Sequence, residues 1–163
     1  MGILETVSQE PIRVLFVCLA NICRSPMAEA LLRHKIDQAG LQDRIEVDSA
    51  GISLWKEGAE PHEGTVAALK SHGIVCNHLA RAIHGSDLQT FDYILAMDNE
   101  ILKSIWSMGK GKARAFPIVR YAAGSGVDRV ADPIRTHKFD ECYDLLDKAC
   151  DGFLANLRRT HSL

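Results

Sequence analysis

The feature that most constrains this chain is a strand-like run that leads, through a short loop, into a helix start. Residues 12–17 (Ile-Arg-Val-Leu-Phe-Val) are largely apolar and partly β-branched, which is typical of a buried strand. Ser25-Pro26 is typical of a helix start, with serine at the N-cap and proline at the first helical position. The loop between them begins with a thiol, Cys18, and ends with a guanidinium, Arg24.

A loop that joins a strand to a helix in this way is suited to binding an oxyanion. The helix N-terminus directs free backbone N–H groups and the positive end of the helix dipole to one point. Arg24 adds a planar fork that can bind two phosphate oxygens, and Cys18 lies in the same positive field. A thiolate that faces bound phosphate is a nucleophile facing electrophilic phosphorus. The spacing Cys-x5-Arg-Ser therefore predicts phosphoryl transfer to cysteine. The alternative is a buried structural cysteine and a surface arginine.

Residues 17–26, Val-Cys-Leu-Ala-Asn-Ile-Cys-Arg-Ser-Pro, closely resemble the signature loop of the low-molecular-weight protein tyrosine phosphatases. Other segments extend the resemblance, in the family's order, from Ile12 to about Leu157. These segments are residues 47–51, 78–81, 91–98 and 132–133. The resemblance implies hydrolysis of phosphotyrosine, and of small aryl phosphates, through a phosphocysteine intermediate. The expected partner is therefore a tyrosine-phosphorylated protein.

Two positions depart from the family's usual pattern. Ala20 stands where glycine is usual, and it would add strain of about 1 kcal/mol if its φ had to be positive. Ile134-Arg135 follow Asp132-Pro133, where many members have aromatic side chains that wall the pocket. Arg135 is expected to favour acidic residues near the phosphotyrosine.

Strand-like and helix-like segments alternate along the chain, which predicts an α/β fold. Strands are expected at residues 12–17, 45–49, 91–97 and 112–118, and helices at 25–39, between 61 and 73, at 99–107 and at 139–157. The order βαβαβαβα predicts a three-layer fold, with a four-stranded parallel sheet and helices on both faces. Such an arrangement is flavodoxin-like, of the phosphatase I type. Its ligands bind at the carboxyl ends of the strands. Residues 1–10 are expected to form a mobile lead-in and residues 11–163 a single phosphatase domain.

Composition limits the partners and the compartment. Nineteen Lys and Arg against 21 Asp and Glu give a net charge of −2, so no overall basic field would recruit nucleic acid. No apolar run is long enough to span a membrane. The five cysteines are Cys18, Cys23, Cys76, Cys142 and Cys150. Because they include no Cys-x2-Cys pair, we expect free thiols in the cytoplasm and no metal. No cofactor is expected, and a monomer is favoured.

The loop residues have predicted roles in phosphoryl transfer. Cys18 is the expected nucleophile, and Arg24 with the loop N–H groups would bind the equatorial oxygens as charge develops. Those N–H groups belong to Leu19, Ala20, Asn21, Ile22 and Cys23. Ser25 can donate its hydroxyl to the Cys18 sulfur, although a helix cap alone is a strong alternative. Asn21 is expected in a left-handed backbone conformation, which asparagine tolerates.

The phenolate that leaves from phosphotyrosine needs a proton, and Asp132 is the best-placed acid. Asp132-Pro133 lies in a long loop, residues 120–138, and loops of that length are usually functional or disordered. By pattern alone a turn-forming Asp-Pro is equally reasonable. The resemblance implies that Asp132 acts as general acid and then as the base that activates water, with Pro133 in a supporting role.

Four further roles follow from the resemblance. Cys23 and Cys18 can form a disulfide that protects the Cys18 thiol from irreversible oxidation. The alternative is that Cys23 is only a small apolar loop residue. In the family a serine and a histidine brace the loop asparagine, and Ser49 and His78 match their positions. An aromatic side chain at Trp55 would line the cleft and stack on the substrate ring. A cleft deepened by this side chain would select phosphotyrosine over the shorter phosphoserine. The alternative is that Trp55 takes part only in hydrophobic packing.

Two other functions are consistent with the loop. A thioredoxin-coupled arsenate reductase shares this fold and loop, but it needs two further cysteines after the third strand, where this chain has Met97-Asp98-Asn99-Glu100. A module that binds phosphorylated ligands without turnover is the second alternative. The retained Cys18, Arg24 and Asp132 argue against it, since binding alone needs neither a thiol nor an acid.

Overall fold

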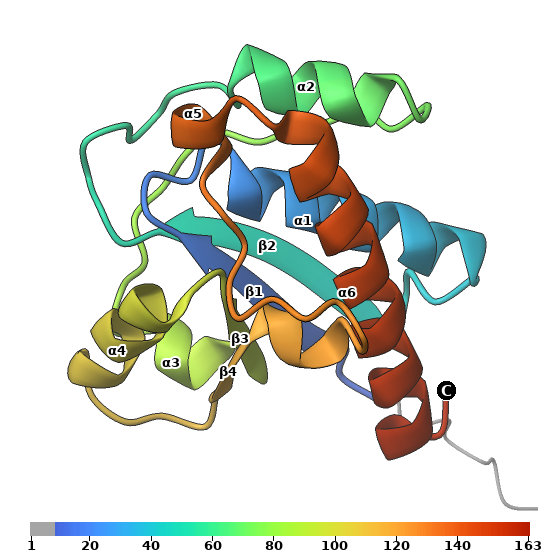
Figure 1. The fold of residues 1–163 in the computed structure, drawn as a ribbon. Coiled ribbons are helices and arrows are strands. Elements are labelled where there is room, and N and C mark those ends of the chain that lie inside the picture. The colour runs from blue at the N-terminus through green and yellow to red at the C-terminus, as the bar shows by residue number, and fades with distance from the viewer. Residues whose placement is uncertain (1–8) are drawn as a thin grey trace, which may run out of the picture.

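Strand β1 (Ile12–Cys18) lies in the interior of a parallel sheet. The computed structural model describes residues 9–163, so most of the expected lead-in at residues 1–10 lies outside the described residues. The other strands are β2 (Ile45–Gly51), β3 (Tyr93–Ala96) and β4 (Arg114–Pro117). All neighbouring strands pair in parallel, in the order β2-β1-β3-β4 (Figure 1). The predicted four-stranded parallel sheet is therefore confirmed.

Helices cover both faces of the sheet. They are α1 (Arg24–Gln38), α2 (Glu63–Lys70), α3 (Asp87–Thr90), α4 (Asn99–Ser107), α5 (Pro133–Thr136) and α6 (Phe139–His161), with a 3-10 turn η1 (Ile118–Tyr121). The helices α1, α2 and α6 lie on one face, and α3 and α4 lie on the other (Figure 1). The sequence did not predict α3 or α5, because four residues are too short to show a helical period.

The burial of β1 explains its unbroken apolar sequence. Val14 and Phe16 point into the cluster formed with α1 and α6, whereas Leu15 and Val17 point into the cluster formed with α4. Successive side chains of a strand alternate between the two faces, so a strand that is covered on both sides needs apolar residues at every position. Only Arg13, near the start of the strand, is exposed.

The start of α1 differs from the prediction. The helix begins at Arg24, Cys23 occupies the N-cap position, and no side chain caps the helix. Ser25 is therefore not the N-cap but the second helical residue, and the prediction was wrong. Its hydroxyl lies 2.9 Å from the Cys18 sulfur instead. Pro26, at the third helical position, removes no intrahelical hydrogen bond, because the first N–H groups of a helix have no partner inside it.

Helix α6 extends to His161, beyond the predicted end near Leu157. Gly152 lies inside it, where glycine costs about 1 kcal/mol relative to alanine. A Cβ atom at Gly152 would lie 2.0 Å from the carbonyl oxygen of Tyr121 at the end of η1. The close approach of η1 therefore accounts for a glycine that helix propensity alone disfavours.

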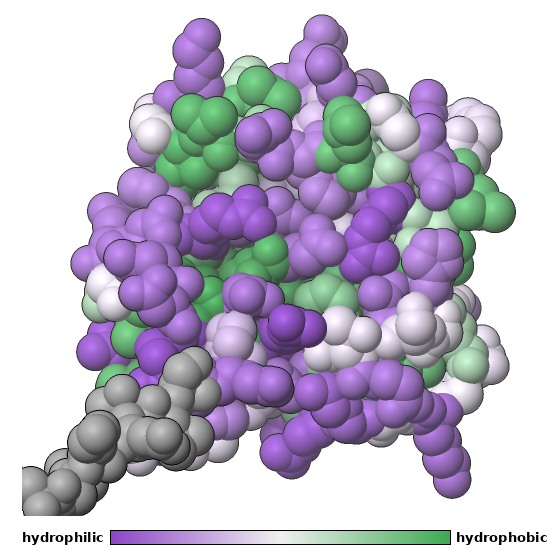
Figure 2. Space-filling model, turned by 180° about the vertical axis from the view of Figure 1, so that it is seen from behind, coloured by the Kyte–Doolittle hydropathy of each residue, from purple (hydrophilic) through white to green (hydrophobic). Residues whose placement is uncertain are grey.

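The sheet order places a topological switch point beside β1. The chain leaves β1 to form β2 on one side and returns to form β3 on the other. Crossovers that diverge in this way leave a crevice at the carboxyl ends of the strands, where ligands of such folds bind. The surface opposite the view of Figure 1 is mostly hydrophilic, with hydrophobic side chains in separate groups (Figure 2). Within residues 9–163, no helix has the length and apolar character needed to cross a membrane.

Candidate active site

The loop from Cys18 to Arg24 lies at the carboxyl end of β1. Asn21 has φ 58°, so the predicted left-handed conformation is confirmed, whereas Ala20 does not have a positive φ and the strain considered for it does not arise. Gly51, which is paired with Cys18 in the sheet register, lies against this loop. A Cβ atom at Gly51 would lie 2.8 Å from the Leu19 oxygen and 3.0 Å from the Asn21 nitrogen. The loop can pass over β2 only because Gly51 has no side chain.

The backbone of the loop presents a set of donors to one side. The N–H groups of Leu19, Ala20, Ile22 and Cys23 find no acceptor in the described part of the chain. Buried or half-buried N–H groups are rarely left without a partner. Grouped at the N-terminus of α1, they form the kind of site that binds an anion.

The sulfur of Cys18 is buried and accepts hydrogen bonds. The Asn21 N–H donates to it at 3.3 Å, and the Ser25 hydroxyl oxygen lies 2.9 Å away. The Asn21 side chain donates to that hydroxyl oxygen at 2.8 Å. The hydroxyl hydrogen can then reach the Cys18 sulfur or, at the longer distance of 3.4 Å, the Ala50 carbonyl oxygen. The shorter contact favours donation to sulfur, which stabilises negative charge there.

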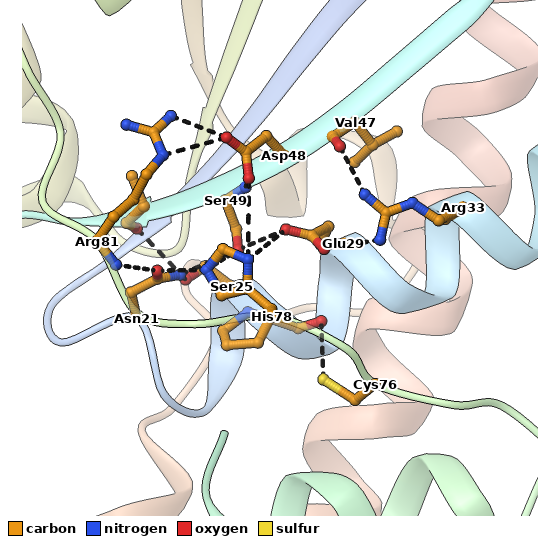
Figure 3. A network of polar contacts seen from close by, with 12 residues as sticks. Asn21, Ser25, Glu29, Arg33, Val47, Asp48, Ser49, Cys76, His78 and Arg81 are labelled. Carbon is orange, nitrogen blue, oxygen red and sulfur yellow. Dashed lines mark hydrogen bonds and ion pairs between the residues drawn. The ribbon is translucent and has the colours of Figure 1, made fainter. Parts of the chain in front are cut away.

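A buried polar network fixes the Asn21 side chain (Figure 3). Its amide oxygen accepts from the Arg81 N–H at 3.0 Å and lies 2.6 Å from Nε2 of His78. Its amide nitrogen donates to the Ser49 hydroxyl at 3.0 Å. Ser49 and His78 therefore make the contacts with the loop asparagine that the resemblance implies. The network joins the loop to β2 and to the connector at residues 74–83.

Glu29 lies at the far end of this network, and sequence reasoning missed it. Only 2% of its surface is exposed, although it belongs to α1. One carboxylate oxygen accepts from the Ser49 hydroxyl at 2.9 Å and lies 3.1 Å from Nδ1 of His78; the other accepts from Arg33 at 2.8 Å. Burial raises the pKa of Glu29, but the hydrogen bond and charge of His78 and the charge of Arg33 outweigh burial and lower it below 4.5. Its spacing of four residues from Ser25 was the available signal, since both lie on one helix face.

Glu29, Asp48 and His78 are the group of described residues with the spacing of metal ligands. One ligand atom from each lies within 4.8 Å of the others. Asp48 pairs with Arg81 at 3.0 Å, however, and Glu29 pairs with Arg33 and His78. Because arginines already balance both carboxylates, we interpret the group as an ion-pair network (Figure 3).

Arg24 is held in place by two acceptors on other strands and loops. Only 5% of its surface is exposed, and its Nη1 donates to Asp98 at 3.0 Å and to the Val130 carbonyl oxygen at 3.1 Å. Asp98 also accepts from the Ile101 N–H at 2.8 Å and thereby caps α4. Its second role, as the partner of Arg24, was not predicted.

Asp132 faces the same cavity as the loop. One oxygen caps α5 by accepting from the Ile134 N–H at 3.1 Å, and the other lies 3.8 Å from Nη2 of Arg24. Pro133 is buried at the first position of α5. Val130 lies two residues before Asp132. Its N–H donates to the Met97 carbonyl oxygen, at the end of β3, at a distance of 2.9 Å. This bond brings the long loop to the carboxyl ends of the strands.

The cavity has a volume of about 230 Å³. Cys18, Arg24 and Asp132 lie in its lining, together with two further polar residues, Ser53 and Arg135. The rest of the lining is Leu19, Ala20, Ile22, Cys23, Trp55 and Ile134. The Trp55 side chain is 80% exposed at the rim, and Nζ of Lys56 lies 4.7 Å from its ring centre. The cavity thus brings together Trp55 and the predicted loop residues other than Asn21 and Ser25. Ser49 and His78 do not line it and contact the loop through Asn21.

Cys23 also lies in this loop, and its thiol is buried. Burial, with the negative charges of Asp132 and Cys18, raises the pKa of Cys23 to about 12. Each of the five cysteines has a free thiol in this structure. Cys23 is therefore a thiol at neutral pH, and its disulfide with the nucleophile stays a prediction.

A parallel sheet with an anion-binding loop at its switch point is typical of proteins that bind phosphate groups. The sequence model described as "Low molecular weight phosphotyrosine protein phosphatase" matches residues 13–163, and the chain belongs to this family. It is 43% identical to the low molecular weight protein-tyrosine-phosphatase YfkJ of Bacillus subtilis over 93% of this chain and 99% of that protein. It is 40% identical to the low molecular weight phosphotyrosine protein phosphatase of Schizosaccharomyces pombe, over 90% and 97% of the two chains.

Solved structures agree. The crystal structure of YfkJ from Bacillus subtilis superposes with a TM-score of 0.90 at 42% identity, covering 93% of this chain and 98% of that one. A Drosophila protein named as an arginine phosphatase superposes with a TM-score of 0.85 at 35% identity, covering 90% and 98%. The α/β fold, predicted from the alternation of strand-like and helix-like segments, is thus confirmed, and so is the family, predicted from the signature loop and the other matching segments.

Proposed function

We propose that this protein hydrolyses phosphotyrosine in proteins, and small aryl phosphates, through a phosphocysteine intermediate. One observation carries the proposal. The Cys18 sulfur, the Arg24 guanidinium and the Asp132 carboxylate line one cavity, although the last comes from a segment more than 100 residues later in the chain. A nucleophile, a cation and an acid at one cavity are the groups that phosphoryl transfer to cysteine requires.

In the first step the phosphate group binds to the loop N–H groups and to Arg24. The Cys18 thiolate attacks phosphorus, so a sulfur–phosphorus bond forms as the bond from phosphorus to the phenolic oxygen breaks. Asp132 gives its proton to that leaving oxygen. Because Asp98 and Val130 hold Nη1 of Arg24, the guanidinium is oriented before the substrate binds. Such preorganised donors stabilise the charge that spreads over the equatorial oxygens.

In the second step water replaces the cysteine. The Asp132 carboxylate takes a proton from water, the oxygen attacks phosphorus, and the sulfur–phosphorus bond breaks to release inorganic phosphate. The Cys18 sulfur leaves as a thiolate. The Ser25 hydroxyl and the Asn21 N–H, which lie 2.9 and 3.3 Å from the sulfur, stabilise its negative charge. In this mechanism Ser25 therefore stabilises the Cys18 thiolate and does not act as a helix cap.

The walls of the cavity support an aromatic substrate. Leu19, Trp55 and Ile134 present apolar surface above the polar floor, and Trp55 can stack on a phenyl ring. Phosphoserine would place its backbone among these walls, whereas phosphotyrosine spans them. Five free thiols support a cytoplasmic location, where such thiols stay reduced.

The test measures hydrolysis of p-nitrophenyl phosphate, without added metal, by the wild type and two variants. We expect Cys18→Ser to lose about 10⁴-fold or more in kcat, and Asp132→Ala to lose about 10²- to 10³-fold. Cys76→Ser is the matched control, because Cys76 does not line the cavity, and it should keep wild-type activity. Undiminished activity in Cys18→Ser would exclude the mechanism.

Two matched peptides, phosphorylated on tyrosine or on arginine, decide the substrate class. The relative that is named an arginine phosphatase makes phosphoarginine the competing substrate. We expect the phosphotyrosine peptide to have the higher kcat/KM, because its ring contacts the apolar walls. A phosphotyrosine peptide that binds without turnover in the wild type would instead indicate a binding module.

A further inference from the structure

A second cavity, of about 380 Å³, adjoins the catalytic one. Leu19, Arg24, Asp132 and Arg135 line both cavities, so no more than these side chains separates them. When a phosphotyrosine side chain enters the first cavity, the residues beside it in the same peptide run along the rim. One of their side chains can then enter the second cavity. The charged groups of the second cavity can therefore influence which peptides the protein prefers.

The carboxylates of the second cavity are all engaged. Asp98 pairs with Arg24 at 3.0 Å, and Asp132 lies 3.8 Å from the same guanidinium. Glu100, at the exposed end, lies 3.5 Å from Lys103. Each acidic group on this side thus has a cation beside it, which reduces its repulsion of an incoming anion.

The two other cations of this cavity, Arg129 and Arg135, are both exposed. Within residues 9–163 neither forms an ion pair. The backbone of Arg135 is placed close to the proposed acid, because its N–H donates to the backbone carbonyl oxygen of Asp132 at 3.0 Å. A residue that lines both cavities, one helical turn after Asp132, is placed to contact a peptide whose phosphotyrosine is bound.

We propose that the second cavity is a subsite for an acidic side chain that flanks the phosphotyrosine, with Arg129 and Arg135 as the specificity-determining residues. The inference rests on the proposed function and names its substrate class, acidic phosphotyrosine peptides. An arginine fork matches a carboxylate with two parallel hydrogen bonds. An exposed ion pair contributes a factor of roughly two to five, so two of them give a preference of about tenfold.

The experiment compares two phosphotyrosine peptides of equal length, with aspartate or with asparagine at the two positions on each side of the phosphotyrosine. For each enzyme the ratio of the two kcat/KM values is measured at low salt. The wild type should prefer the acidic peptide by about tenfold, and Arg129→Gln/Arg135→Gln should lower that ratio below about twofold. Both kcat/KM values are measured on the same enzyme preparation. A partial loss of folded protein therefore lowers both values equally and leaves their ratio unchanged.

Arg159→Gln is the matched control. Arg159 is exposed, forms no ion pair within the described residues, and lies in the last turn of α6 (Figure 1). Helix α6 is 23 residues long, which places that turn about 30 Å along the helix from the end nearest the site. The control removes the same charge as one of the test substitutions, and it should keep the wild-type preference.

Three results would overturn the inference. Equal kcat/KM for both peptides in the wild type would exclude the subsite and leave the proposed function intact. A ratio that falls as far in Arg159→Gln as in the double variant would assign the preference to overall charge. Hydrolysis of neither peptide by a wild type that hydrolyses p-nitrophenyl phosphate would overturn the phosphotyrosine function, and the subsite with it.

Discussion

The two segments that meet at the active site are held in different ways. The loop from Cys18 to Arg24 belongs to a buried network, in which the Asn21 side chain alone contacts four partners. These are Ser25, Ser49, His78 and Arg81. The segment at residues 122–138, which carries Asp132, is anchored mainly at Val130, through Met97 and Arg24. It has a cavity on either side, and Gly124 and Gly126 precede its anchor with positive φ.

This difference separates two tasks of the site. The groups proposed to bind phosphate and to attack it are preorganised, since their hydrogen-bond partners are in place before the substrate binds. Asp132, the proposed proton donor, lies on a segment with few buried contacts, and such segments open more readily than the core. We expect substitutions behind the loop to affect every substrate. Substitutions beneath the Asp132 segment should affect most strongly the substrates whose leaving group needs a proton.

Among the substitutions that test this comparison, the largest expected effect comes from displacing the loop from outside. In Gly51→Ala the new Cβ atom meets the Leu19 oxygen at 2.8 Å and the Asn21 nitrogen at 3.0 Å, so the loop must shift. A displacement near 1 Å at a reacting group costs about 100-fold in kcat. The measurement is kcat for p-nitrophenyl phosphate.

Gly85→Ala is the matched control for that substitution. A Cβ atom at Gly85 meets nothing within 4 Å, and Gly85 does not have a positive φ. Its activity should equal that of the wild type. Wild-type kcat in Gly51→Ala as well would show that the loop adapts without cost, and the comparison between the two segments would lose its basis.

The next largest effect is expected from removing the charge of Glu29, at the far end of the network. In Glu29→Gln the half-buried His78 and the nearby Arg33 lose their carboxylate partner. Breaking a buried ion pair costs about 3 kcal/mol in the free energy of unfolding, and we expect kcat to fall about tenfold as Asn21 loses its support. Urea unfolding at neutral pH and steady-state kinetics measure the two effects. Full stability in the variant would contradict the assignment.

The stability difference should also depend on pH. The pKa of Glu29 is lower in the folded protein than its ordinary value of 4.5, so the unfolded chain binds a proton first as the pH falls. The contribution of Glu29 is therefore complete above about pH 4.5 and is lost as the pH falls through the folded pKa. The gap between the wild type and Glu29→Gln should narrow below pH 4.5, and a gap that widens there would be the wrong sign.

A smaller effect is expected from loosening the Asp132 segment. Val130→Ala removes two methyl groups from a side chain that is 1% exposed, at a cost of about 1–3 kcal/mol. We expect a fall of roughly fivefold in kcat/KM, which reports the first step, for phenyl phosphate, whose leaving group needs the proton, and a smaller fall for p-nitrophenyl phosphate. Val127→Ala, at an exposed position of the same segment, is the control. An equal loss on both substrates would place the effect outside proton transfer.

The smallest effect is expected at Ala20. Its φ is not positive, so Ala20→Gly relieves no strain and only increases the freedom of the unfolded chain. The free energy of unfolding should fall by about 0.4–1 kcal/mol, and kcat/KM should change less than about twofold. A tenfold rise in kcat/KM would show that the alanine does hinder phosphate binding.

The sequence predicted the parts of the site that are local in the chain. The apolar run of β1, the loop and the left-handed Asn21 each follow from a few adjacent residues, and the parallel sheet follows from their order. Glu29 and the bond between Asp98 and Arg24 could not be predicted in this way. They depend on which residues the fold brings together, and a glutamate in a helix is ordinarily on its solvent face. The cap assigned to Ser25 was wrong for the same reason, because its hydroxyl has a partner on β1.

The distance along the chain between contacting groups has a consequence for folding. Arg24 donates to a carbonyl 106 residues away, and Asn21 contacts His78 57 residues away. Contacts of such high sequence separation form only after long loops have closed, which is slow. A nascent or partly folded chain can therefore form β1 and α1 before its thiol is correctly held. The regain of activity during refolding should lag behind the regain of helical signal, because catalysis reports the last of these closures.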